Sequence, residues 1–372
     1  MRPRVHSFAV ELTAECNQQC RYCYNREQAA QEALDRSAER PSAAEQQALL
    51  LRRVDRLLDA FDVDHLTLTG GEPFAQPALW PLLERLRARD VPVQIISNGG
   101  LITAAVAARL APLGVLAVQL TLNGPDAELH AEHTGNRTHF DRTLRGVAEL
   151  RRAAVPVVGC VVVTRQNAHR LDEILELWSS LGVTDVALSR FSPAGQAIEH
   201  AARLLPSMDD VADALRRARP FTAERGMKLT STMPIPPCML DTAELEPIRF
   251  GSCAIGTALQ ELALGADGQL RHCTLHRAPL GSGGDVADAG VDLVALIRSA
   301  DVLEYRQRFP RFCDGCLHAA SCGGGCGAAA DWMLGPADEG RRNADPFLWQ
   351  HMDADLAERL GRSGDPSDDD PE

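Results

Sequence analysis

Residues 7–25 read SFAVELTAECNQQCRYCYN, and the interpretation of the whole chain starts from this stretch. Its apolar run Phe8–Leu12 has the length and composition of a β-strand that is buried on both faces. Cys16, Cys20 and Cys23 follow this run directly. Three thiolates at this spacing can bind three irons of one four-iron cluster and leave the fourth iron open for a ligand. A zinc site made of the same three cysteines is the alternative.

The pattern of a short apolar run followed by a longer amphipathic run repeats up to about residue 200. The predicted strands are Phe8–Leu12, His65–Thr69, Val93–Ser97, Val115–Leu122, Val157–Thr164 and Asp185–Arg190. The predicted helices are Ala43–Phe61, Leu79–Arg89, Thr103–Leu113, Phe140–Ala154 and Leu171–Leu181. Six such βα units with short connections predict an α/β fold, a partial (β/α)6 barrel of TIM type. Functional groups are expected on the loops at the carboxyl ends of its strands.

Composition excludes several classes of function. The net charge of −13 argues against nucleic acid or an anionic membrane as a partner, since both require a basic surface. No apolar run approaches the ~18 residues of a membrane span, and the first residues do not form a signal peptide. A cytoplasmic protein is therefore expected. In that reducing compartment eleven cysteines predict metal binding rather than disulfide bonds.

Nine of the eleven cysteines fall into two groups, of which the first is the set described above. The second group contains Cys253, Cys273, Cys313, Cys316, Cys322 and Cys326. Cys160 lies inside an apolar run and is predicted to be a buried core thiol. Cys238 ends a Pro-rich segment and is predicted to be a lone packed thiol. His272 and His276 flank Cys273 and are interpreted as exposed polar residues, with metal binding as the alternative.

These patterns divide the chain into four predicted segments. Residues 1–205 form the barrel, and 206–250 form a connecting helix and a Pro-rich linker. Residues 251–335 are rich in Cys and Gly and form a small domain held together by metal. Residues 336–372 form a C-terminal helix, Pro346–Leu360, and an acidic tail that is expected to be disordered.

The first cysteine motif resembles that of the radical S-adenosylmethionine (SAM) superfamily. The resemblance implies that Cys16, Cys20 and Cys23 hold a [4Fe–4S] cluster, which cleaves bound SAM to a 5′-deoxyadenosyl radical. Other positions match the segments of this family that contact SAM, through adenine, the amino group, the ribose or the carboxylate. They are Tyr22, the GGEP motif Gly70-Gly71-Glu72-Pro73, Ser97, Asn98 and Arg137. Asn123 stands where the family usually has Asp, which leaves its role open.

The second cysteine group resembles the SPASM extension of this superfamily, which carries two auxiliary [4Fe–4S] clusters. The resemblance assigns one set of cysteines to each cluster. The first set is Cys253, Cys273 and Cys326, and the second is Cys313, Cys316 and Cys322. A zinc ribbon is the alternative for this group.

The seventh signature cysteine of the SPASM extension is missing. Where the family reads Asp-Pro-x-Cys, this chain reads Asp345-Pro346-Phe347-Leu348. Three explanations remain open. The second auxiliary cluster takes an oxygen or nitrogen ligand from Asp345, His351 or Asp331; it is open or labile; or it is absent. One or two auxiliary clusters are therefore expected.

The resemblance implies oxidative modification of a ribosomal peptide precursor, with formation of a C–C or C–heteroatom cross-link in natural-product maturation. The alternatives are a dehydrogenase of a small alcohol, aminoglycoside or nucleoside, formylglycine formation of the sulfatase type, and a non-enzymatic scaffold. Few residues precede Cys16, so recognition of a leader peptide is expected from a separate protein or from the SPASM region. An electron donor such as flavodoxin or ferredoxin is the other expected partner.

Overall fold

The computed structural model describes residues 2–25, 42–335 and 340–352 of the chain. The acidic tail and the second half of the predicted helix Pro346–Leu360 lie outside these residues. The side chain of His351 also lies outside the described part of the structure.

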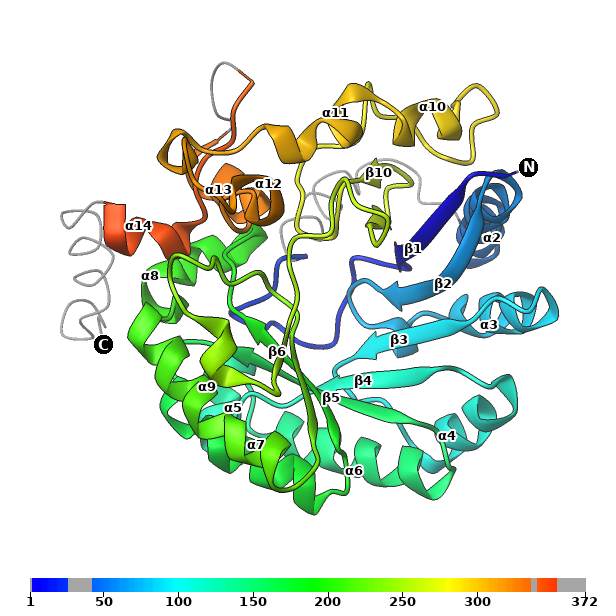
Figure 1. Ribbon diagram of the computed structural model, residues 1–372. Coiled ribbons are helices and arrows are strands. Elements are labelled where there is room, and N and C mark those ends of the chain that lie inside the picture. The colour runs from blue at the N-terminus through cyan, green and yellow to red at the C-terminus, as the bar shows by residue number, and fades with distance from the viewer. Residues whose placement is uncertain (1, 26–41, 336–339, 353–372) are drawn as a thin grey trace, which may run out of the picture.

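The described strands form one curved sheet in the order β10-β9-β1-β2-β3-β4-β5-β6-β7-β8. All neighbouring strands are parallel except β9 and β10. The sheet curves around but stays open between its edges, which confirms the predicted partial barrel (Figure 1). The strands are β1 (Arg4–Glu11), β2 (Asp62–Thr69), β3 (Val93–Ser97), β4 (Ala117–Thr121), β5 (Val157–Val163), β6 (Asp185–Arg190), β7 (Lys228–Ser231), β8 (Arg249–Phe250), β9 (Glu261–Leu264) and β10 (Leu270–Arg271).

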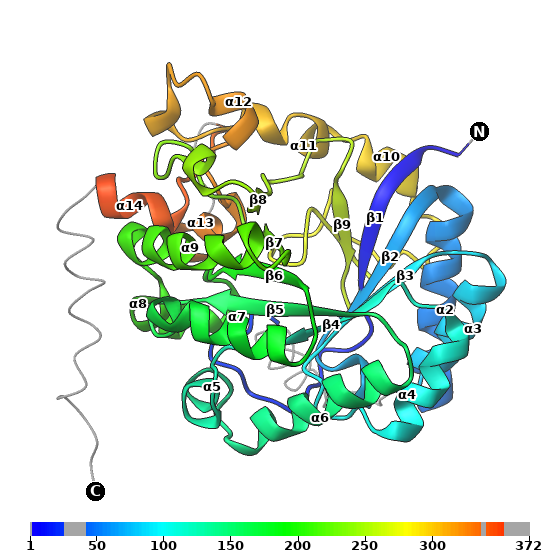
Figure 2. The ribbon, with the colours of Figure 1, turned by 60° about the horizontal axis from the view of Figure 1, so that its bottom comes forward.

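Helices cover the outside of the barrel, and most of the remaining helices belong to the C-terminal half (Figure 2). The outer helices are α2 (Ala43–Ala60), α3 (Leu79–Ala88), α4 (Ala104–Leu110), α6 (Thr138–Arg152), α7 (Leu171–Ser180) and α9 (Met208–Ala223). The others are α5 (Ala127–Thr134), α8 (Ala201–Leu204), α10 (Leu293–Ile297), α11 (Ala300–Leu303), α12 (Ala319–Cys322), α13 (Gly327–Leu334) and α14 (Pro346–Met352).

The outer helices form because their apolar residues recur at helical spacing and face the sheet. In α2 the buried residues are Leu50, Val54, Leu57 and Leu58, which lie on one face. The helix begins with the predicted capping box: the Ser42 side chain accepts from the Glu45 backbone, and the Glu45 carboxylate accepts from the Ser42 backbone. The six predicted strands and five predicted outer helices are present, with ends that differ by a few residues.

The sheet also recruits strands that the sequence pattern does not predict. β9 comes from the Cys/Gly-rich segment and pairs in parallel with β1, so that Phe8 lies opposite Leu262. At the other edge, β7 and β8 extend the sheet beyond β6. The proposed boundary at residue 251 stays a prediction, but the sheet itself continues across it.

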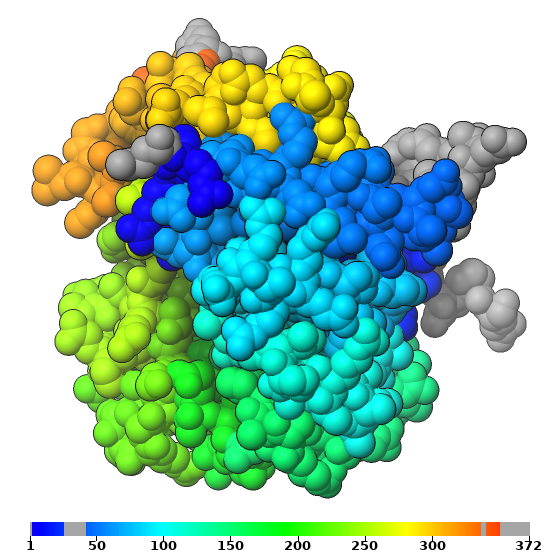
Figure 3. Space-filling model, turned by 90° about the vertical axis from the view of Figure 1, so that its right-hand side faces the viewer, coloured from blue at the N-terminus to red at the C-terminus, as the bar shows by residue number. Residues whose placement is uncertain are grey.

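A second contact joins the C-terminal half to the barrel. The Arg53 guanidinium of α2 binds the Asp285 carboxylate at 2.5 Å and the Ala266 carbonyl at 2.8 Å. Figure 3 shows the yellow C-terminal segment lying against the blue residues of the first part of the chain. Among the described residues, no helix is long and apolar enough to span a membrane.

Candidate functional site

The cysteine loop, residues 12–25, runs from the end of β1 past the carboxyl ends of the other barrel strands (Figure 1). Two glycines after β2 meet it backbone to backbone. The Gly71 N–H donates to the Thr13 carbonyl at 2.6 Å, and the Glu72 N–H donates to the Glu15 carbonyl at 3.0 Å. A Cβ on Gly71 would collide with the Glu15 carbonyl, and one on Gly70 would lie 2.5 Å from the Thr13 oxygen. The GGEP motif therefore positions the loop that carries Cys16.

The Glu72 carboxylate is completely buried, and its hydrogen-bond partners are protein groups. It accepts from the Phe74 N–H at 3.0 Å, the Ser97 hydroxyl at 2.8 Å and the Asn98 N–H at 2.9 Å. Burial raises the pKa of Glu72, and the three hydrogen bonds oppose that shift. The carboxylate thus joins the ends of β2 and β3, while Pro73 begins the turn that follows. Its pairing with the SAM ammonium stays a prediction.

The three N-terminal cysteines lie together in this loop. The charges of Cys16 and Cys23 interact, and both Cys20 and Cys23 lie close enough to interact with the Tyr22 phenol. Cys16 is exposed, while Cys20 and Cys23 are half-buried. The Asn98 amide donates to the Asn17 side chain at 2.7 Å and lies 3.8 Å from the Cys16 sulfur. The end of β3 therefore meets the first cysteine.

Helix α5 supports the middle of the cysteine loop, and the sequence analysis did not predict this helix. The Arg21 N–H donates to the His133 carbonyl at 2.9 Å, and the Arg21 guanidinium donates to the Glu132 carbonyl at 3.0 Å. The ring of Tyr22 lies 6.4 Å from that of His133. Burial lowers the pKa of His133 to about 4, so its imidazole is neutral. The available signal was the cap Asp126, whose side chain accepts from two N–H groups of the first turn.

Asn123 and Arg137, two further residues named in the sequence analysis, differ in burial. Asn123 is buried after β4, and its side-chain oxygen accepts from the Val162 N–H at 2.8 Å, which ties β4 to β5. Arg137 is exposed directly before α6. Its contact with the SAM carboxylate stays a prediction.

The first auxiliary set lies at one place in the C-terminal half. The charge of Cys326 interacts with those of Cys253 and Cys273, and burial raises the pKa of Cys273 to about 12. Near neutral pH such a thiol is protonated unless a bound metal stabilises the thiolate. The Cys326 N–H donates to the Asp345 carboxylate at 2.8 Å.

The interpretation of His272 and His276 as exposed polar residues is wrong. His272 is 7% exposed, and its ring centroid lies 4.8 Å from that of His276 and 4.9 Å from that of Tyr305. Burial lowers their pKa values, to about 4 for His272 and about 3 for His276. Both rings are therefore neutral and belong to a buried aromatic cluster beside Cys273.

The second auxiliary set, Cys313, Cys316 and Cys322, lines a pocket of about 220 Å³. Cys238 lines the same pocket and is exposed, so the prediction of a packed lone thiol is wrong. Cys160, in contrast, is buried in β5 as predicted.

The chemistry of the donor sets fits iron–sulfur clusters. Zinc bonds of ~2.3 Å would draw tetrahedral thiolates to within about 4 Å of each other. Among the described residues, no three His, Cys, Asp or Glu side chains converge in a way that could hold one metal ion. Each set consists of cysteine thiols, which are the ligands that hold iron–sulfur clusters.

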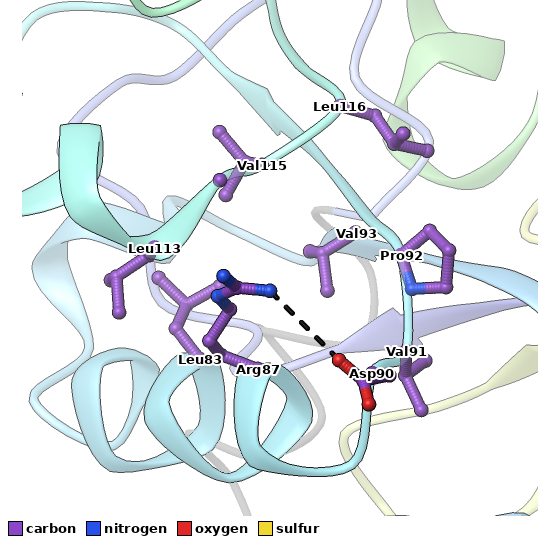
Figure 4. A pocket seen from close by; sticks show the side chains of 10 residues that line it. Leu83, Arg87, Asp90, Val91, Pro92, Val93, Leu113, Val115 and Leu116 are labelled. Atoms are coloured by element: carbon purple, nitrogen blue, oxygen red, sulfur yellow. Dashed lines mark ion pairs between the residues drawn. The ribbon is translucent and has the colours of Figure 1, made fainter.

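A second pocket of about 200 Å³ lies elsewhere (Figure 4). Its lining includes Val93 at the start of β3 and Leu116 just before β4, together with the ion pair Arg87–Asp90 at 3.9 Å. This position is at the amino ends of the strands, away from the cysteine loop. The pocket therefore does not belong to the candidate site.

Comparison with known proteins shows which family the sequence matches. The sequence model of the Radical SAM superfamily matches residues 10–177. Mycofactocin maturase MftC of Mycobacterium tuberculosis is 31% identical over 200 residues, 54% of this chain and 48% of that protein. AdoMet-dependent heme synthase of Oleidesulfovibrio alaskensis is 27% identical over 233 residues, 62% of this chain and 56% of that protein. The chain thus spans about half the length of the curated relatives it matches.

Two solved structures share the fold over most of the chain. Streptococcus suis SuiB has a TM-score of 0.69 at 15% identity and covers 92% of this chain and 77% of that one. The structure of anSMEcpe with bound AdoMet and the Cp18Cys peptide has a TM-score of 0.64 at 16% identity, and covers 96% and 98%. The likeness includes the C-terminal half that lies beyond residue 177.

Proposed function

We infer that the chain is a radical SAM superfamily enzyme that oxidatively modifies a ribosomal peptide precursor, forming a C–C or C–heteroatom cross-link. The observation that carries the proposal is the docking of the GGEP turn on the cysteine loop. Two hydrogen bonds and two glycine contacts fix Cys16 at the carboxyl ends of the strands. This is the edge of a barrel at which catalytic groups gather.

Cys16, Cys20 and Cys23 would hold the [4Fe–4S] cluster, and the loops around Gly70 and Asn98 would contact SAM. When bound and reduced, this pair supplies the 5′-deoxyadenosyl radical that removes a hydrogen atom from the substrate. The chain itself positions the reacting groups. The buried Glu72 fixes the loops after β2 and β3 relative to one another, and α5 fixes the loop between Cys20 and Cys23.

The C-terminal thiols support an oxidative outcome. A substrate that has lost a hydrogen atom must release one more electron before it becomes a stable product. Cys253, Cys273 and Cys326 would hold an auxiliary cluster that accepts this electron, and a reduced flavodoxin or ferredoxin would supply the electron for SAM cleavage. The electron carriers within the enzyme itself would then all be iron–sulfur groups.

A peptide substrate is supported by relatives of the same fold. SuiB has been crystallised with the precursor peptide SuiA, and anSMEcpe with the Cp18Cys peptide. A small-molecule substrate is the second candidate, because a heme synthase also aligns with more than half of this chain. A separate leader-binding protein is compatible with the peptide proposal.

Product analysis distinguishes these substrates. The reconstituted enzyme is incubated without oxygen with SAM, a reductant and a peptide encoded by a short reading frame beside the gene. A peptide that loses two hydrogens, together with formation of 5′-deoxyadenosine, would support the proposal. If the peptide stays unchanged while an alcohol, aminoglycoside or nucleoside loses two hydrogens, the peptide assignment is wrong.

A further inference from the structure

The pocket lined by the second auxiliary set contains a fourth cysteine in addition to the three signature cysteines that this chain retains. We propose that Cys238 is the fourth thiolate of the second auxiliary cluster and replaces the signature cysteine that the chain lacks. The proposal rests on the proposed function only in taking the cofactor of this pocket to be an iron–sulfur cluster. It concerns cofactor binding, so it can be tested without a substrate.

Four thiols surround this pocket, and they come from two parts of the chain. Cys313, Cys316 and Cys322 come from the segment around α12, and Cys238 comes from the Pro-rich loop after β7. The charge of Cys238 interacts with those of Cys316 and Cys322, and the charge of Cys313 interacts with that of Cys238. Four cysteine thiolates are the ligand set that a [4Fe–4S] cluster requires when no coordination position is left open.

The position of the missing cysteine lies at the same pocket. Leu348 stands where the resemblance to the SPASM extension places the seventh cysteine, and its side chain lines the pocket and is 1% exposed. The loss of a thiol at residue 348 therefore coincides with the presence of a thiol at residue 238 on the same cavity.

A buried arginine holds the two segments together. The Arg190 guanidinium donates to the Pro234 carbonyl at 3.2 Å and to the Asp345 carboxylate at 2.6 Å, and the residue is 2% exposed. Pro234 precedes Cys238 in the Pro-rich loop, and Asp345 precedes Leu348 at the start of α14. One side chain thus fixes the loop of Cys238 against the segment that would otherwise supply the ligand.

The described alternatives to Cys238 fit less well. The two Asp345 oxygens already accept from Arg190, from the Cys326 N–H and from the Phe347 N–H, and the side chain is completely buried. Asp331 lies 4.0 Å from His276 and does not line the pocket. His318 does line it, and it is the competitor that the experiment must exclude.

The test counts iron and acid-labile sulfide in the full-length chain. The background variant is Cys16→Ala/Cys20→Ala/Cys23→Ala, so that the remaining iron belongs to the C-terminal half. After anaerobic reconstitution this background should hold about 8 iron per chain, and added Cys238→Ala should lower the count, to about 7 if only the iron that loses its thiolate is released and to about 4 if the whole cluster is lost. Cys160→Ala, which removes a buried thiol outside all three sets, and His318→Ala should both leave the count unchanged.

A cysteine introduced at another position of the pocket shows whether Cys238→Ala loses iron because a ligand is missing or because the region misfolds. Adding Leu348→Cys to the Cys238→Ala variant should restore about 8 iron and the corresponding EPR signal of the reduced protein. A full iron count in Cys238→Ala, a loss caused by His318→Ala, or the absence of rescue by Leu348→Cys would each contradict the proposal. So would zinc in place of iron. An inactive enzyme that keeps these counts would contradict only the proposed function.

Discussion

The cysteine loop and the C-terminal cysteine region both present cysteine thiols, yet the chain holds the two regions in place by different means. The loop is fixed by backbone hydrogen bonds from neighbouring strand ends, such as the bond from the Gly71 N–H to the Thr13 carbonyl. In the C-terminal region, arginine side chains donate to loop carbonyls. Arg306 reaches the Cys253 carbonyl at 2.5 Å, and Arg342 reaches the Gly323 carbonyl at 2.8 Å.

This difference explains which of the structural supports can be recognised from sequence. A backbone contact that requires glycine can be recognised in the sequence as a short local motif, and GGEP is such a motif. An arginine that donates to a carbonyl many residues away produces no such local motif. The predictions below separate the two kinds of support, from the largest expected effect to the smallest.

The largest effect is expected in the cysteine loop itself. Cys16→Ala should abolish formation of 5′-deoxyadenosine, because two thiolates do not hold the cluster that binds SAM. The measurement is 5′-deoxyadenosine in the presence of SAM and a reductant, with Cys160→Ala as the matched control. Continued SAM cleavage in Cys16→Ala would contradict the assignment of this loop.

Cys253→Ala should differ from Cys16→Ala in its effect on SAM cleavage. It should keep SAM cleavage and lose the modified product, because the auxiliary set takes part only after hydrogen abstraction. Chromatography of 5′-deoxyadenosine and mass spectrometry of the product measure the two quantities together. If product still forms at the wild-type rate, the C-terminal region is structural and the two regions do not cooperate in catalysis.

The buried pair of Arg190 and Asp345 supports the C-terminal region, with side chains that are 1% and 0% exposed. Asp345→Ala should lower the free energy of unfolding by about 3–5 kcal/mol, because it leaves a buried guanidinium unpaired. Denaturant titration measures this loss. The double variant Arg190→Met/Asp345→Leu should recover part of it, and a single variant as stable as wild type would show that the pair does not hold the region.

Gly71→Ala should act on the cysteine loop alone. The new methyl group collides with the Glu15 carbonyl, and overpacking of this kind costs about 1–3 kcal/mol. SAM cleavage should fall while the iron of the C-terminal region stays bound. Gly290→Ala is the control, because the nearest atom to a Cβ added there, Asp288 Oδ1, lies at 3.4 Å, an ordinary contact distance. Equal effects of the two substitutions would contradict the positioning role of the GGEP turn.

The smallest effect is a pH dependence at the junction of the two regions. Burial raises the pKa of Glu11, at the end of β1, to about 7, and Arg271 of β10 opposes the shift. Because the folded pKa lies above that of the unfolded chain, the stabilising contribution is complete below pH ~4.5 and is lost as the pH rises through 7. In Glu11→Gln the free energy of unfolding should fall less over this pH range than in the wild type, by about 1–3 kcal/mol. Parallel unfolding curves of both proteins from pH 5 to 8 would exclude the effect.

The sequence predicted most of the barrel because its strands and helices are long and periodic. It did not predict β7 to β10, because these strands have only two to four residues and are added to the edges by tertiary contacts. It placed Cys16, Cys20 and Cys23 at one site because they are close in sequence. It missed Cys238, since a Pro-rich loop and the buried Arg190 bring this thiol to cysteines more than seventy residues away.

The most direct test of the account is an iron and sulfide count on the wild-type chain and on Cys16→Ala/Cys20→Ala/Cys23→Ala. The account predicts about 12 iron in the wild type and about 8 in the variant, because each set of cysteines holds its own cluster. A variant with no iron and one or two zinc ions would contradict it. The C-terminal region would then be a structural zinc domain, and the oxidative chemistry proposed for this enzyme would lose its electron acceptor.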